Sequence, residues 1–152
     1  MPITRARAEA VLVDRCGPWM VKATMDVTFD GANPSLNESL RQGLTQSGYT
    51  VADPFLVTDA DLAALDVAND LDEFLDRAEL RVLRTVQTRL VKVTTMVEAV
   101  QVLNSDLIRG IDAVVKEKTA QVKASWGLPG GKLSSGVLSL DFAQAAPGCE
   151  GE

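Results

Sequence analysis

The chain has 152 residues, a length that suits one domain, and it carries a formal charge of −6 with two cysteines and no histidine. Hydrophobic residues make up 46% of the sequence and aromatic residues only 5%, so aliphatic side chains must build the core. The missing histidine excludes a Ser-His-Asp triad, a Cys-His pair and any His-ligated metal site. Two cysteines, Cys16 and Cys149, cannot form a zinc site alone or a disulfide framework. Composition therefore predicts a soluble helical domain and indicates no reaction, cofactor or metal.

The charge is unevenly distributed along the chain. Residues 53–79 carry nine acidic side chains against Arg77 alone, a net charge of −8, whereas residues 80–126 carry eight basic side chains against four acids, a net charge of +4. An acidic chain argues against general nucleic-acid binding, which depends on neutralising phosphates with Lys and Arg. The positive segment leaves a local basic face possible.

No targeting or membrane-spanning segment is expected. Arg5 and Arg7 precede no sustained apolar run, and no stretch of about 18 uncharged apolar residues exists. With one cysteine near each end of the chain, we expect a reducing, cytoplasmic setting. Cys16 is then expected to be a small buried residue.

The first quarter of the chain predicts one helix and one ambiguous stretch. Apolar residues recur at helical spacing over 4–15, and Gly17-Pro18 is expected to stop that helix. Residues 25–29 alternate between polar and apolar, which fits either a short strand or an extended loop.

A well-punctuated helix is predicted over 34–47. Asn33 suits the N-cap, and Pro34 suits the first helical position. Gly48 suits the left-handed residue that closes a helix, with Tyr49 packing back in a Schellman motif. Gly43 in the helix interior costs about 1 kcal/mol relative to Ala, which suggests close packing there.

Three further helices follow. A short helix is predicted over 59–66. It begins after Thr58, which with Asp61 forms a weaker variant of the capping box. A longer helix runs from about 70 to 90, and the β-branched run 91–95 is expected to end it. The longest helix is then expected over 96–126, with a kink possible inside it.

The end of the chain changes character. Gly127 closes the last helix, and Pro129-Gly130-Gly131 predicts a hinge. Leu138, Leu140 and Phe142 then alternate with polar residues, as in a half-buried strand that needs a partner. We therefore divide the chain into a helical domain, 1–127, and an extended docking segment, 128–152. The predicted fold is mainly α: a small helical bundle with a long C-terminal helix and an extended, strand-like C-terminal segment.

Several motifs invite a chemical interpretation, and none is complete. Gly130-Gly131-Lys132 lacks the earlier glycine and the following Ser or Thr of a phosphate loop. Asp59 and Asp61 begin like a calcium loop, but alanines occupy the next required positions. Paired carboxylates for glycoside hydrolysis have few aromatic residues beside them. We therefore expect no enzyme.

Two tryptophans and a basic run remain as interaction candidates. Trp19 and Trp126 flank helix ends, where a core or interface anchor is favoured over a ligand stack. The basic face comprises Arg81, Arg84, Arg89 and Lys92. Such a face is usually solvated, but it is suited to an acidic segment of a neighbouring subunit or to nucleic acid.

Three stretches resemble the adaptor, or head–tail connector, proteins of tailed bacteriophages and prophages. They are GYTVADP at 48–54, VTDADL at 57–62 and LDRAELRVL at 75–83. The order then continues alike, with a β-branched break, a long charged helix ending at Trp126-Gly127, and the closing GVLSLDF at 136–142. The resemblance covers most of residues 1–143. It departs at Val97, Val100 and Val102, where similar proteins carry more charge, and this suggests a more buried contact.

The resemblance implies a structural virion protein, made in the host cytoplasm and located at the head–tail junction. Such proteins form a homo-oligomeric ring, commonly of twelve subunits, that binds the portal protein and presents a surface to the stopper or tail-completion protein. The extended end would dock on the portal or on an adjacent subunit, a form of strand addition. The implied docking residues are Trp126, Val137, Leu138, Leu140 and Phe142.

A ring around exiting DNA favours acids on its inner wall, because they repel phosphates and limit contact to passive passage. We therefore expect some of the acids of the negative segment 53–79 to face the lumen or a basic neighbouring surface. These acids are Asp66, Asp70, Asp72, Glu73 and Asp76. The alternative function is a small cytoplasmic helical protein with an interaction or regulatory role.

Overall fold

The computed structural model describes residues 2–66, 70–96 and 101–128, with side chains given except at 66, 93–96 and 101–104. Within these ranges the chain is mainly helical, as the sequence predicts, and contains no strand. The predicted strand at 132–142 lies outside them. The elements in chain order are α1 (Arg5–Lys22), α2 (Pro34–Gln46), α3 (Asp59–Ala63), the 3₁₀ turn η1 (Ala64–Asp66), α4 (Asp70–Met96) and α5 (Gln101–Trp126).

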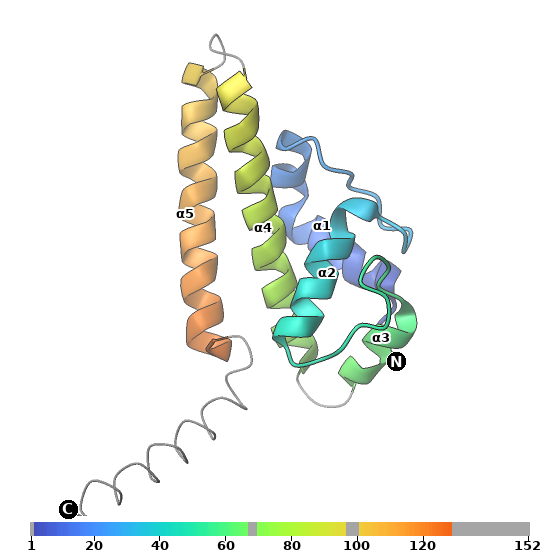
Figure 1. Cartoon of the computed structure of the whole chain (residues 1–152). Helices are drawn as coiled ribbons and strands as arrows, with labels where there is room; N and C mark the ends of the chain where they lie inside the picture. Colours follow the sequence, from blue (N-terminus) through green and yellow to red (C-terminus); the bar gives the residue numbers. More distant parts are fainter. Residues whose placement is uncertain (1, 67–69, 97–100, 129–152) are drawn as a thin grey trace, which may run out of the picture.

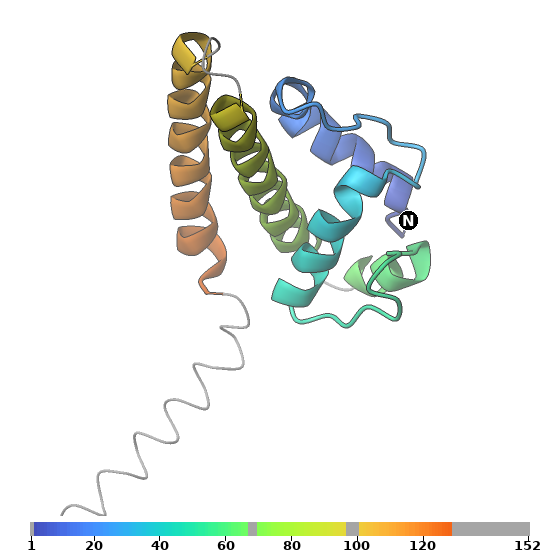
Figure 2. The same ribbon diagram turned by 45° about the horizontal axis from the view of Figure 1, so that its top comes forward.

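Helix α4 is the centre of the bundle. It packs against α1, α2 and α5, and α5 runs antiparallel to it along one side of the molecule (Figure 1). Both views place α3 and the segment that precedes it on the side away from α5 (Figure 2). The molecule therefore has a helical-hairpin side, made by α4 and α5, and an opposite side made by α3 and nearby loops.

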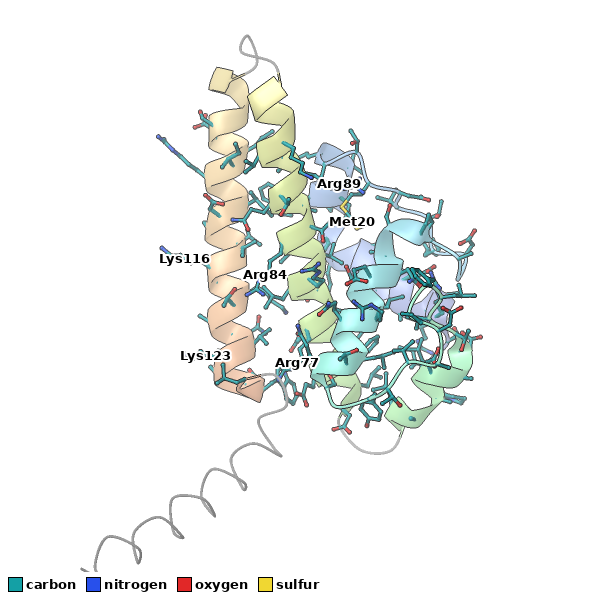
Figure 3. All side chains as sticks on the ribbon, viewed as in Figure 1. Met20, Arg77, Arg84, Arg89, Lys116 and Lys123 are labelled. Atoms are coloured by element: carbon teal, nitrogen blue, oxygen red, sulfur yellow. The ribbon has the colours of Figure 1, made fainter. Side chains whose placement is uncertain are left out.

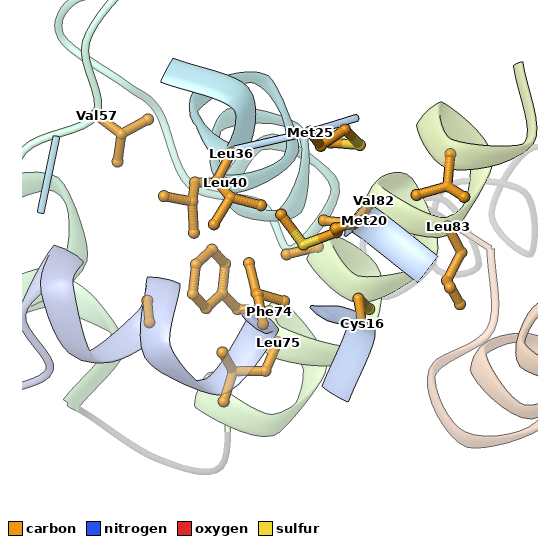
Figure 4. Packing of buried hydrophobic residues seen from close by; sticks show 14 of the residues in the cluster. Cys16, Met20, Met25, Leu36, Leu40, Val57, Phe74, Leu75, Val82 and Leu83 are labelled. Atoms are coloured by element: carbon orange, nitrogen blue, oxygen red, sulfur yellow. The ribbon is translucent and has the colours of Figure 1, made fainter. Parts of the chain in front are cut away.

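The core lies between α1, α2 and α4. Phe74 is fully buried there beside Leu40 of α2, and Met20 and Cys16 come from α1 (Figure 4). Gly43 lets α2 and α4 approach closely, because a Cβ at this position would lie 3.0 Å from the Cβ of Ala78 and 3.0 Å from the Phe74 carbonyl oxygen. This confirms the close packing that an interior glycine suggests.

Both predicted ends of α2 and the predicted start of α3 are confirmed, whereas the helix expected over 59–66 is α-helical only to Ala63 and continues as the 3₁₀ turn η1. The Asn33 side chain accepts a hydrogen bond from the Ser35 amide at 2.8 Å, and Gly48 has a φ of +91°. The Tyr49 amide donates to the Leu44 carbonyl at 2.9 Å, which is the long bond of a Schellman motif. At α3, the Thr58 amide donates to the Asp61 carboxylate at 2.8 Å.

Two predicted helix ends are wrong. Helix α1 continues through Gly17-Pro18 to Lys22, and Pro18 lies inside it. Proline in a helix loses one hydrogen bond and crowds the preceding residue, and Gly17, which has no Cβ, relieves that crowding. Helix α4 likewise continues through 91–95 to Met96, because β-branched residues lower helix propensity by only a few tenths of a kcal/mol and antiparallel packing on α5 outweighs this.

Residues 25–29 form a loop, and α5 is one continuous helix from Gln101 that ends before Gly127, whose φ is +72°. The expected start at 96 is therefore wrong, because Met96 belongs to α4. The Trp19 ring fills the space beside Gly110 of α5, where an added Cβ would lie 3.0 Å from the indole. The same ring lies 4.8 Å below the Lys22 ammonium. Trp19 is thus an intramolecular anchor between α1 and α5.

Candidate functional site

An ion-pair cluster joins α1, α4 and α5. Lys118 of α5 has a side chain only 10% exposed, and its Nζ lies 3.0 Å from Asp76 and 2.9 Å from Glu79 of α4. Arg15 of α1 approaches the same Glu79 carboxylate at 2.9 Å. Two cations therefore share two carboxylates on α4, and we call these four residues the interhelical cluster. Cys16 is buried beside it, and burial together with the Glu79 charge raises the pKa of the thiol to about 12.

The last turn of α5 is fastened to the same part of α4. The Trp126 indole Nε1 donates to Asp76 Oδ2 at 2.9 Å. Arg77 pairs with Glu73 at 2.8 Å and donates to the carbonyl oxygens of Trp126 and Gly127 at 3.3 and 3.5 Å. The point where the chain leaves the helical body toward residue 129 is therefore held on two sides.

The Asp76 carboxylate balances two opposing effects. Burial raises its pKa, whereas the hydrogen bonds from Trp126 and Lys118 and the nearby positive charges lower it. The hydrogen bonds and charges have the larger effect, so the pKa of Asp76 is below its usual value. Asp76 is therefore ionised at neutral pH and serves as an internal counter-ion.

Some of the acids predicted to face the lumen or a subunit interface have partners within the chain. Glu73 and Asp76 are used inside the chain, as described above. Asp70 accepts a hydrogen bond from the Tyr49 hydroxyl, which raises the pKa of Tyr49 to about 12. Asp72 is exposed, and the Asp66 side chain lies outside the described residues. Of the four acids whose side chains are described, Asp72 is the one most open to solvent.

The predicted basic face is spread over α4. Arg84, Arg89 and Lys92 are exposed, whereas Arg81 is half-buried and contributes to the lowered pKa of Glu38. Figure 3 shows Arg84 on the α4–α5 side of the bundle, near Lys123 of α5. Sequence reasoning missed Lys116 and Lys123, because only the antiparallel pairing of the helices places them opposite α4.

A pocket of about 190 Å³ opens between α2, α4 and the C-terminal end of α5. Its apolar lining is Leu80, Val122 and Leu128, and Arg84 and Lys123 are its exposed cations. A larger, shallower groove of about 720 Å³ continues along α5 and shares Lys123 and Thr119 with the pocket. Together they form a continuous concave surface, which we call the α4–α5 groove.

Another buried ion pair lies on the opposite side of the molecule. Glu9 is fully buried and pairs with Arg5 at 2.8 Å, and its carboxylate accepts the Gly31 and Asn33 amides at 2.7 and 3.1 Å. Arg5 also donates to the Val57 carbonyl at 2.8 Å. This pair secures the loops that precede α2 and α3. It was missed from sequence, where Arg5 and Glu9 look like an ordinary surface pair on a helix.

The loop before α3 presents two exposed apolar side chains. Phe55 is 87% exposed and Leu56 is 50% exposed, and we call these two residues the Phe55 tip. The predicted docking residues Val137, Leu138, Leu140 and Phe142 lie outside the described part of the chain. Trp126, the remaining one, is half-buried and bonded to Asp76.

The described residues hold no group of three or more His, Cys, Asp or Glu side chains placed to bind a metal ion. Over the same ranges, no helix is both long enough and apolar enough to cross a bilayer. A scan against protein-family models found no matching family, and searches of curated proteins and of solved structures found no significant match.

Proposed function

We propose that this chain is a non-enzymatic structural protein, the adaptor subunit of a ring between the portal and the stopper or tail of a bacteriophage particle. It completes the DNA-filled head and is located at the head–tail junction. The observation that carries the proposal is the fastening of Trp126 and Gly127 to α4. The resemblance of 48–54, 57–62, 75–83 and 136–142 to adaptor proteins supports it.

The fastened exit gives segment 128–152 a fixed origin on the helical body. A tethered segment binds with an effective concentration set by the position of its attachment point, so a fixed origin favours docking at a defined distance. Force on the segment passes through Asp76 and Arg77 into α4, the central helix of the bundle. Such an arrangement suits a subunit that must hold a portal under load.

The charge layout supports a position around DNA. Asp72 is exposed on the first turn of α4, close to Asp70. We assign Asp72, together with Asp66 and Asp70, to the channel wall or to a basic neighbouring subunit. Glu73 and Asp76 leave this group, because both already neutralise cations of their own chain.

The alternative is a small helical interaction or regulatory protein. The exposed cations of the α4–α5 groove favour it, because Arg84, Lys116 and Lys123 are suited to an acidic ligand. A nucleic-acid ligand would bind more weakly as salt rises, with a slope that counts the phosphate contacts. Fluorescence anisotropy with a labelled duplex at several salt concentrations separates this alternative from the adaptor.

Particle incorporation tests the proposed function directly. A chain that ends at Gly127 should keep its helical circular dichroism, because the core residues and the Asp76 hydrogen bond precede residue 128. It should fail to copurify with particles, whereas the full chain is incorporated. Incorporation of the shortened chain at the full level contradicts the docking role of 128–152.

A further inference from the structure

The Phe55 tip is exposed but firmly held. The Phe55 amide donates to Asp53 Oδ1 at 2.9 Å, and the Leu56 amide donates to the Asp53 carbonyl at 3.2 Å. The next residue, Val57, is buried and is fixed through its amide to Asn37 at 2.9 Å. A rigid loop that displays an aromatic ring to solvent is typical of an anchor in a protein–protein interface, because little entropy is lost on docking.

The pocket of the α4–α5 groove is the right size for such a ring. Its volume is about 190 Å³, and a cavity of roughly 150 Å³ accommodates benzene. Leu80 and Val122 are buried and provide an apolar floor. Phe55 of the same chain does not occupy it, because that ring is 87% exposed and its loop lies on the side away from α5 (Figures 1 and 2).

The two surfaces also carry opposite charges. The tip and its flanks, residues 49–61, contain Asp53, Asp59 and Asp61 and no basic residue. The pocket lining contains no acid, and its exposed cations are Arg84 and Lys123 (Figure 3). Arg77 also lines it but is already paired with Glu73. Opposite charges around an apolar centre favour one partner and one orientation.

We propose that the Phe55 tip of one copy inserts into the pocket of the α4–α5 groove of a second copy. Because the two surfaces differ and lie on opposite sides of the subunit, the contact is head-to-tail, and a pair of copies keeps one free tip and one free pocket. Repetition of such a contact closes into a ring when the rotation per subunit allows it. The closed ring rests on the proposed adaptor function, which this contact deepens. The pairwise contact between two copies does not depend on that function and is tested without a portal.

The test places a photoreactive residue at the tip. The full chain is made with p-benzoylphenylalanine in place of Phe55, mixed with ¹⁵N-labelled wild-type chain and irradiated over a series of concentrations. We expect cross-links between labelled and unlabelled chains that map by mass spectrometry to 77–84 or 119–128. The same probe in place of Phe29, which is 57% exposed in another loop, is the matched control and should give less than a tenth of that yield.

Charge reversal gives the second readout. Arg84→Glu should lower the cross-link yield at least tenfold, whereas Arg89→Glu, an exposed arginine of the same helix outside the pocket, should leave it within twofold. Circular dichroism of each variant checks that it is folded. Cross-links that map to 129–152 or elsewhere, their absence, or equal effects of the two reversals overturn the proposal.

The result also separates this contact from the adaptor function. If the chain binds the portal but its Phe55 tip cross-links outside the pocket, the adaptor function is supported and the Phe55 contact is overturned. Cross-links to the pocket without any portal binding support the Phe55 contact and contradict the adaptor.

Discussion

The indole N–H of Trp126 donates to the carboxylate of Asp76 at 2.9 Å, fifty positions earlier in the chain. The same carboxylate accepts a hydrogen bond from Lys118 at 3.0 Å. One acid of α4 therefore fixes two points near the C-terminal end of α5. The interhelical cluster and the exit of the C-terminal segment are thus one connected unit.

Removal of Lys118 should destabilise the folded chain. Lys118→Met leaves Asp76 and Glu79 with only Arg15 as a counter-ion, so we expect a loss of about 2–3 kcal/mol in the free energy of unfolding, somewhat below the cost of breaking a fully buried pair. Urea unfolding followed by circular dichroism measures it. Lys116→Met, an exposed lysine on the same helix, should change stability by less than about 0.5 kcal/mol, and equal losses contradict the role of the cluster.

Lowering the pH should remove the contribution of Asp76 to the stability of the folded chain. Its pKa is lower in the folded chain than its ordinary value of 3.8, so its stabilising effect is fully present above about pH 4 and is lost as pH falls through the folded pKa. Unfolding of the wild type and of Asp76→Asn should differ at pH 7 and converge toward pH 2. A difference that stays constant over this range contradicts the assignment.

Tyr49 is the single tyrosine of the chain, so its ionisation can be followed alone. The hydrogen bond to Asp70 raises its pKa to about 12 from an ordinary value of 10. This contact stabilises the fold fully below pH 10 and is lost as pH rises toward 12. Ultraviolet titration should show Asp70→Asn moving the pKa toward 10, while Asp72→Asn leaves it unchanged. An ionisation near pH 10 in the wild type contradicts the contact.

Gly43→Ala should destabilise the chain although alanine favours helices. The added Cβ meets the Phe74 carbonyl and the Ala78 Cβ at 3.0 Å, and overpacking of this kind costs about 1–3 kcal/mol. The gain in helix propensity is about 1 kcal/mol, so we expect a net loss of about 1 kcal/mol in chemical unfolding. Thr45→Ala, on the exposed face of α2, is the control and should be neutral within about 0.5 kcal/mol. A stabilised Gly43→Ala variant would show that α2 and α4 are not in tight contact.

Helix ends that depend on neighbouring residues were predictable. The hydrogen bonds at Asn33 and Gly48 span only two to five positions, so the sequence alone identifies the cap and the Schellman motif. The wrong ends share one cause. The β-branched run 91–95 is a weak helix breaker and Pro18 is a strong one, and at both places tertiary contact with the rest of the bundle overrides the local signal.

The site was less predictable, because its residues meet only through tertiary structure. The pairing of Arg5 and Glu9 is visible in the spacing, but their burial depends on loops that arrive from residues 26–33 and 53–59. Similarly, Glu73 and Asp76 look like members of a solvated acidic face. Only the antiparallel placement of α5 brings Lys118 and Trp126 to Asp76, and so turns a predicted surface acid into an internal one.

Mass photometry of the full chain with the portal ring of the particle that encodes it tests the adaptor function most directly. The chain alone should be a monomer or a small oligomer of a 16.3 kDa subunit. With the portal present, we expect an added mass that saturates at a whole-number ring of subunits and is absent for the chain that ends at Gly127. A chain that stays monomeric and leaves the portal mass unchanged would contradict the adaptor function.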